Sequence, residues 1–158
     1  MLSGVQFRLR RVFEILGRRQ WRVVRRPGWA YSSGLWRAFG HPEVAIFGLP
    51  HDRWGLVNVV ADLVSAGVRL PPGAELDDVL VGSRVAVRRI DPSWRSRLFG
   101  PGAPECVQIV WPDADGGFPW DPGGDGLRLP RLWLPVDDHP PLPDLWPGRH
   151  PVAGGWRS

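Results

Sequence analysis

Apolar positions recur along the chain with two different spacings, and the helical spacing occurs in two long segments. From Val5 to about Gly17 the apolar residues form one stripe and the arginines lie largely off it, which predicts a basic amphipathic helix over residues 1–20. Residues 51–67 carry a second apolar stripe behind Asp52, a residue type that caps helices. This second segment is predicted to be the main packing helix.

Short apolar runs between Gly- and Pro-containing turns predict strands at residues 21–25, 29–35, 44–49, 85–90 and 107–111. The run at 44–49 is apolar enough for a central position in a sheet. Residues 69–83 are predicted to be a loop with room for one more short strand. Asp91 followed by Pro92 is typical of the start of a short helix.

These elements predict an α+β fold with a mainly antiparallel, bent sheet or a small split barrel, and with the helix at 51–67 packed across it. The order of strand, Gly-rich turn, apolar strand and helix is also similar to the split barrels of flavin reductases, which is an analogy at the level of the fold alone. The chain of 158 residues suits one domain, predicted at 21–126. Residues 127–158 are Pro-rich and are predicted to be an extended tail, laid over the domain or partly loose.

The charge of the chain is +4, and every one of its basic residues is Arg. Arginine suits a phosphate or nucleic-acid partner, but a coding bias also explains the missing lysines and is favoured because lysine is absent everywhere. Cys106 is the single cysteine, which excludes an internal disulfide. No apolar run approaches the ~20 residues of a membrane span, so a cytoplasmic protein without membrane contact is expected.

The segment Gly40-His41-Pro42-Glu43 is the first candidate site. Histidine changes its charge near neutral pH, which suits proton transfer, and Glu43 could orient its ring or act itself. The alternative is a tight turn in which Gly40 and Pro42 set the backbone and His41 hydrogen-bonds a carbonyl group. Both interpretations remain open at the level of the sequence.

The second candidate is the loop that contains Asp113, Asp115 and Asp121. Several carboxylates together suit a hard cation, but the spacing does not follow the calcium-loop pattern, and Asp is common in turns for its backbone hydrogen bonds. No metal site is therefore predicted. Phe118 and Trp120 could form an apolar wall for a flat ligand or a partner side chain.

Two long motifs carry a resemblance to a known family. The stretches YSSGLWRAFGHPEVAIFGLP (Tyr31–Pro50) and VQIVWPDADGGFPWDPG (Val107–Gly123) resemble the opening and closing blocks of domain-of-unknown-function family 4262. The resemblance covers about residues 21–125. The family is common in actinobacterial proteins, which fits the arginine bias. Its activity is not established, so the resemblance implies a domain and not a reaction.

Two functions from different classes follow from these features. In the first, the protein binds or transforms an unknown small molecule in a cleft between the two motifs, with His41 as general acid/base and with Asp121 or Glu43 as its orienting carboxylate. The ligand would contact Tyr31, Ser33, Trp36, Asp113, Asp115, Phe118 and Trp120.

In the second, the protein is a non-catalytic binding protein that uses its Arg-rich N-terminal segment and its Trp- and Pro-rich tail. A protein partner or a second copy of the chain would fit this function, and nucleic acid is not favoured. The sequence specifies no cofactor and leaves open whether the protein is an enzyme.

Overall fold

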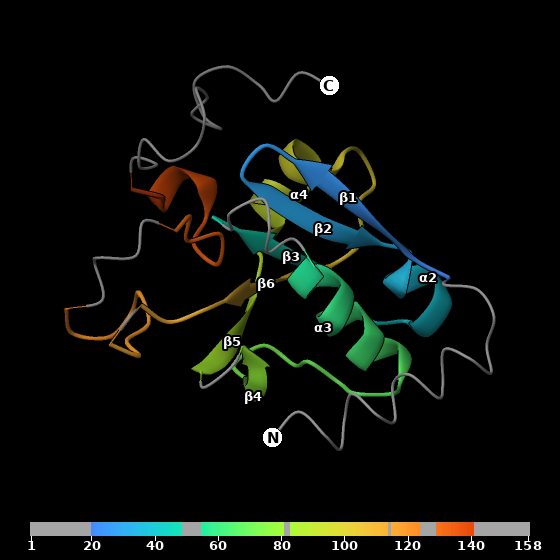
Figure 1. Ribbon diagram of the computed structural model, residues 1–158. Helices are drawn as coiled ribbons and strands as arrows, with labels where there is room; N and C mark the ends of the chain where they lie inside the picture. The colour runs from blue at the N-terminus through green and yellow to red at the C-terminus, as the bar shows by residue number, and fades with distance from the viewer. Residues whose placement is uncertain (1–19, 49–54, 81–82, 114, 124–128, 141–158) are drawn as a thin grey trace.

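A six-stranded sheet with the order β1-β2-β3-β6-β5-β4 forms the centre of the molecule (Figure 1). The computed structural model describes residues 20–48, 55–80, 83–113, 115–123 and 129–140. The strands are β1 (Arg22–Arg26), β2 (Trp29–Ser33), β3 (Glu43–Phe47), β4 (Glu75–Leu80), β5 (Ser83–Arg89) and β6 (Cys106–Val110). The helices are α2 (Leu35–Phe39), α3 (Gly55–Ser65), α4 (Pro92–Phe99) and the 3-10 turn η3 (Val136–Asp138). Together they make a single α+β domain, as the sequence predicts.

The sheet is mixed but mostly antiparallel, and its one parallel pair among the described strands is β3 with β6 at its centre. Glu43 pairs with Cys106 and Ile46 with Ile109, so these two strands begin at the same end of the sheet. The outer strands are β1 and β4, and the sheet is open. The prediction of a mainly antiparallel sheet is confirmed, while the barrel alternative is wrong, because the described strands form an open sheet with β1 and β4 as its outer strands.

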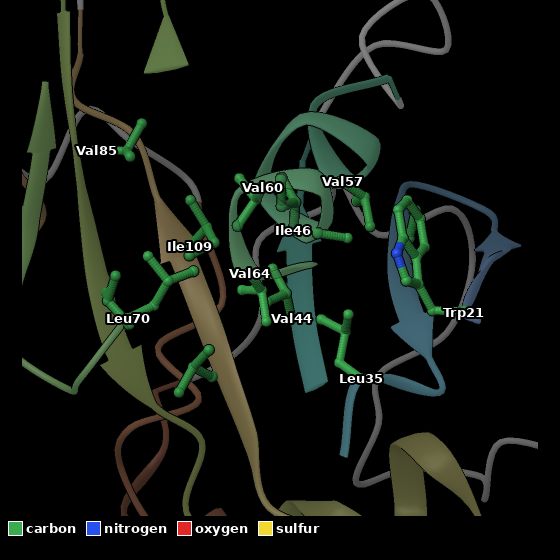
Figure 2. Packing of buried hydrophobic residues seen from close by; sticks show 14 residues of the cluster. Trp21, Leu35, Val44, Ile46, Val57, Val60, Val64, Leu70, Val85 and Ile109 are labelled. Atoms are coloured by element: carbon green, nitrogen blue, oxygen red, sulfur yellow. The ribbon is translucent and has the colours of Figure 1, made fainter. Parts of the chain in front are cut away.

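One face of the sheet is covered by α3, whose buried residues are Val57, Val60, Ala61, Leu63 and Val64. Alternate residues of the central strands, such as Val44 and Ile46 of β3, pack against this helix (Figure 2). The predicted packing helix is therefore confirmed for the described residues 55–65. The predicted helix at 1–20 lies outside the described residues.

The opposite face is covered by α4 and by residues 129–140. Ala45 and Phe47 alternate with the α3-facing residues of β3 and pack with Trp94, Leu132 and Val136. Since β3 is buried on both faces, its central position agrees with the prediction from its apolar run. The N-terminus of α4 also forms as predicted, because the Asp91 carboxylate accepts a hydrogen bond from the backbone N–H of Ser93 (3.0 Å).

Residues 129–140 are an integral part of this second layer. The buried Gln108 of β6 donates to the carbonyl of Pro130 (2.8 Å) and accepts from the N–H of Leu132 (3.2 Å). The Trp94 indole donates to the carbonyl of Leu134 (2.7 Å). This part of the tail thus lies over the domain as one of the two predicted arrangements, and residues 141–158 lie outside the described residues.

Candidate binding site

The side chain of Glu43, at the start of β3, organises the turn between β2 and α2. The residue is 6% exposed. Its carboxylate accepts hydrogen bonds from the hydroxyl of Ser32 (2.6 Å) and from the backbone N–H groups of Gly34 (2.8 Å), Leu35 (3.3 Å) and Trp36 (3.2 Å). The Ser32 hydroxyl in turn accepts from the N–H of Val44 (2.9 Å). A buried carboxylate is stable in such a place because several donors replace the water it has lost.

Gly34 is required at this turn for two reasons. Its φ of 121° lies in a region that side-chain-bearing residues rarely adopt, and a Cβ atom there would lie 2.6 Å from the carbonyl oxygen of Gln20 and 2.9 Å from the Cα of Trp21. The chain can therefore turn directly from β2 into α2 against β1. The sequence predicted a strand over 29–35 and missed α2, because the carboxylate that completes the turn comes from the next strand.

An open pocket of about 710 Å³ lies beside this turn and is named here the α2 pocket. Its wall includes Trp21, Ser33 and Glu43 from the sheet region, Trp36 and Arg37 from α2, and Arg22 from the start of β1. Gly102 and Pro104, from the loop after α4, complete one side. Trp36 is 48% exposed, and among the described residues it is the large apolar side chain that is most open to solvent.

His41 lies outside the α2 pocket, and both of its ring nitrogens are engaged. Nδ1 lies 2.8 Å from the carbonyl oxygen of Pro42, and Nε2 lies 3.1 Å from the backbone nitrogen of Leu70. An N–H must donate to Nε2, so the ring is the neutral tautomer with its proton on Nδ1. The side chain is 3% exposed and lines a separate pocket of about 200 Å³ with Val64 and Ser65 at the end of α3.

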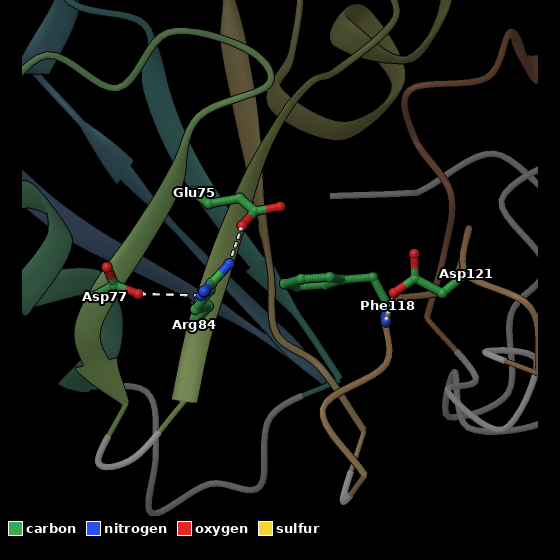
Figure 3. Close-up of polar contacts among 5 residues, drawn as sticks. All are labelled: Glu75, Asp77, Arg84, Phe118 and Asp121. Carbon is green, nitrogen blue, oxygen red and sulfur yellow. Dashed lines mark hydrogen bonds and ion pairs between the residues drawn. The ribbon is translucent and has the colours of Figure 1, made fainter.

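The loop after β6 closes on itself through its own carboxylates. Asp113 accepts from the backbone N–H groups of Asp115 (2.9 Å) and Gly117 (2.8 Å), and Asp121 accepts from that of Phe118 (2.9 Å). Figure 3 shows the Phe118 ring directed from this loop toward the sheet, with Asp121 behind it. No cluster of His, Cys, Asp or Glu that could hold a metal occurs in the described part of the chain. The turn interpretation of this loop accounts for each of these contacts.

The aromatic side chains of the same loop cover the sheet. Phe118 stacks on Trp120 (5.0 Å between ring centroids), and the guanidinium of Arg88 lies 3.8 Å from the centroid of the Trp120 ring. Trp120 also meets Trp133 edge to face at 5.4 Å. The rings proposed as an apolar wall for a ligand thus pack against one another and against Arg88 of the sheet.

The two predicted halves of the site lie at opposite ends of the sheet. Glu43 is at the start of β3, and the loop with Asp113 follows the end of β6, which runs parallel to β3 from the same starting end. A strand rises roughly 3.3 Å per residue, so β6 alone separates the two by about 13 Å. The structure therefore does not bring His41 or Glu43 together with Asp113, Asp115 and Asp121.

Three of the predicted residues, Ser33, Trp36 and Glu43, share the α2 pocket. Tyr31 instead packs edge to face on Phe99 at 4.9 Å. The sequence prediction missed Arg22 and Arg37 as lining residues. The position of Arg37 directly after Trp36 was a usable signal, whereas Arg22 reaches the pocket only through the pairing of β1 with β2.

Cys106, which pairs with Glu43 across the central strands, is an unreactive thiol. It is 1% exposed, and burial raises the pKa of its thiol to about 12, with a further contribution from the negative charge of Glu43. At neutral pH it is a thiol and not a thiolate, so it is no nucleophile. This agrees with the expectation that a single cysteine in an apolar strand packs in the core.

Comparison with known proteins identifies a family. A family model described as a domain of unknown function (DUF4262) matches residues 12–125, which include both sequence motifs. No curated protein and no solved structure matches the chain. None of the described helices has the length and apolar character that crossing a membrane requires.

Proposed function

The chain belongs to the DUF4262 family, and we propose that its function is to bind a small organic molecule in the α2 pocket. The binding is non-catalytic as far as the described side chains are concerned. The ligand lies against the exposed face of Trp36. The carboxylate of Glu43 stabilises the wall of the pocket through its hydrogen bonds to the backbone and takes no part in a reaction.

The observation that carries this proposal is the combination of pocket and exposed indole. A volume of about 710 Å³ lies within the range of roughly 300–1,000 Å³ that is usual for small-molecule sites. Trp36 leaves 48% of its surface open beside this volume. Large aromatic side chains stabilise bound flat molecules by stacking and by apolar contact.

The hydrogen bonding of the candidate catalytic groups supports binding over catalysis. A general base needs a free lone pair within reach of the substrate, but both nitrogens of His41 are engaged and Glu43 already accepts four hydrogen bonds. Ser33 would need an adjacent base to act as a nucleophile. The other charged residues of the described lining are arginines, which stay protonated.

The second function predicted from the sequence, a binding protein that uses the Arg-rich N-terminal segment and the Trp/Pro-rich tail, falls mainly on residues 1–19 and 141–158. These lie outside the described residues, and the idea stays a prediction. A protein partner or a second copy of the chain belongs to that prediction, and a nucleic-acid partner remains the less favoured form.

The proposal is tested by titrating the full ¹⁵N-labelled chain with naphthalene-2-carboxamide, a flat and neutral probe. We expect the indole N–H signal of Trp36 and the amide signals of Gly34 and Arg37 to shift together and to saturate. Trp36→Ala should weaken binding at least about tenfold, as expected for loss of a stacking surface. The control Arg84→Ala, near the opposite edge of the sheet, should leave binding unchanged.

Arg84 is a suitable control because it is exposed and pairs with Glu75 (3.1 Å) and Asp77 (3.3 Å) on β4 (Figure 3). Shifts confined to the region of Trp120 and Trp133, or equal binding by Trp36→Ala and by the native chain, would overturn the proposal.

A further inference from the structure

We propose that the ligand of the α2 pocket is an organic anion, with a flat ring on Trp36 and a carboxylate or phosphate group held by Arg22 and Arg37. This inference rests on the proposed function and extends it by naming the chemical class of the ligand.

The two arginines reach the pocket from different elements. Arg22 begins β1 and pairs with Ser33, the last residue of β2, so its position is set by the sheet. Arg37 directly follows Trp36 in α2, whose start is held by the carboxylate of Glu43. Both are exposed residues that line the pocket. The backbone therefore places two arginine residues around one volume that the exposed Trp36 also lines.

Neither arginine is neutralised within the described part of the chain. The ion pairs found there join Arg84 to Glu75 and Asp77, and Arg89 to Glu105, and none includes Arg22 or Arg37. The acid in the described lining is Glu43, whose oxygens already accept four hydrogen bonds. Among the described residues, the lining thus offers two arginines to a ligand, and its acid, Glu43, has its hydrogen-bonding positions already filled.

Such a lining selects for anions on physical grounds. The guanidinium group presents paired N–H donors that match a carboxylate or a phosphate, and charge-assisted hydrogen bonds of this kind are roughly twice as strong as neutral ones. A cationic ligand would meet two like charges at close range. A neutral ligand would gain the contact with Trp36 but would leave both guanidinium groups in water.

The test uses two matched pairs of probes that differ mainly in charge. The first pair is naphthalene-2-carboxylate and naphthalene-2-carboxamide, and the second is adenosine 5′-monophosphate and adenosine. Calorimetric titration of the full chain at low salt should give at least about tenfold tighter binding of the anion in one pair or both. The pair that shows this preference identifies the acid group as a carboxylate or a phosphate.

The variants Arg22→Gln and Arg37→Gln should each reduce the preference for the anion severalfold, because the affinity for the anion falls more than the affinity for its neutral partner. Arg84→Gln, a matched loss of one exposed arginine, should change neither. Raising the salt concentration should weaken the anions alone, because only they use exposed charges.

The outcomes separate this inference from the proposed function. If anion and neutral probe bind equally and Trp36→Ala weakens both, the pocket binds small molecules and the anion inference is wrong. If no probe of either pair binds, both are wrong. If the preference for the anion survives in the Arg22→Gln/Arg37→Gln double variant, the anion is held elsewhere and the inference fails.

Discussion

At both ends of the sheet, carboxylates accept hydrogen bonds from backbone N–H groups, but only one end has an open pocket beside it. At the α2 end, the carboxylate of Glu43 comes from one strand and holds the backbone of a different segment, nine residues earlier at Gly34. At the other end, Asp113 and Asp121 hold N–H groups that lie within four residues of themselves. The first arrangement leaves an open pocket beside it, and the second folds a loop down onto the sheet.

The difference teaches what a polar motif among Gly and Pro residues can mean. A carboxylate that accepts hydrogen bonds only from its own loop stabilises a turn, and its removal disturbs that loop alone. A carboxylate that joins a buried strand to a separate turn stabilises the packing of two different segments, and here one of them lines the pocket. Four single substitutions test this comparison, and the expected loss of stability falls from Glu43→Ala to Asp91→Ala.

Glu43→Ala should cause the largest loss, about 4 kcal/mol in the free energy of unfolding. The substitution leaves the hydroxyl of Ser32 and three backbone N–H groups without their acceptor, and each buried donor left unpaired costs about 1–3 kcal/mol. Urea unfolding followed by circular dichroism measures the loss. A cost below about 1 kcal/mol would mean that water replaces the carboxylate, and the comparison would fail.

Phe118→Ala should cost about 3 kcal/mol, as is usual for a buried phenylalanine. Its ring is 6% exposed and packs with Ala86, Val110 and Leu129. The same unfolding experiment should therefore show that the loop after β6 is held mainly by its aromatic side chains. A cost no greater than that of Asp121→Ala would contradict this.

Asp121→Ala should cost only about 1 kcal/mol, because a single backbone N–H at a part-buried turn loses its acceptor. Binding in the α2 pocket should be unchanged, since the loop lies at the other end of the sheet. A probe titration of this variant serves as the check. Any loss of binding beyond about twofold would show that the two ends communicate.

Asp91→Ala is the reference for an exposed carboxylate at a helix start and should cost about 1 kcal/mol at neutral pH. Hydrogen bonds from the hydroxyl and then the backbone N–H of Ser93 lower the pKa of Asp91 below its ordinary value. A carboxyl group with a lowered pKa in the folded state stabilises the protein above its unfolded pKa and loses that effect as the pH falls through the folded value.

The difference in stability between the native chain and Asp91→Ala should therefore be constant near neutral pH and should shrink in acid. Chemical unfolding at a series of pH values measures it. A difference that grows on acidification would show that the charged form of Asp91 is not the one that stabilises α4.

Much of the fold could be predicted from local patterns. Local sequence signals suffice for several elements: the apolar runs of β3 and β6, the apolar stripe of α3, and the Asp91-Pro92 start of α4. The helix α2 and the open sheet could not be, because the first depends on Glu43 from the next strand and the second on which strands become neighbours.

The candidate site was harder to predict for the same reason. Ser33, Trp36 and Glu43 are close in the sequence and were predicted as site residues. Arg22 joins them only through the register of β1 with β2, which spacing along the chain does not give. A single cleft between the two motifs requires their polar residues to meet at one end of the sheet, whereas the parallel direction of β3 and β6 places them at opposite ends.

That same parallel pair has a consequence for how the protein is made. Glu43 and Cys106 are about sixty residues apart, so the central ladder closes only after a long loop has formed, which is slow for entropic reasons. On the ribosome, β1, β2 and β3 emerge first, and β3, apolar and buried on both faces in the finished domain, has one edge without a partner until β6 is synthesised. During this interval the nascent chain exposes an aggregation-prone edge, and we expect its yield in cells to depend on translation speed and chaperone supply more than its final stability would suggest.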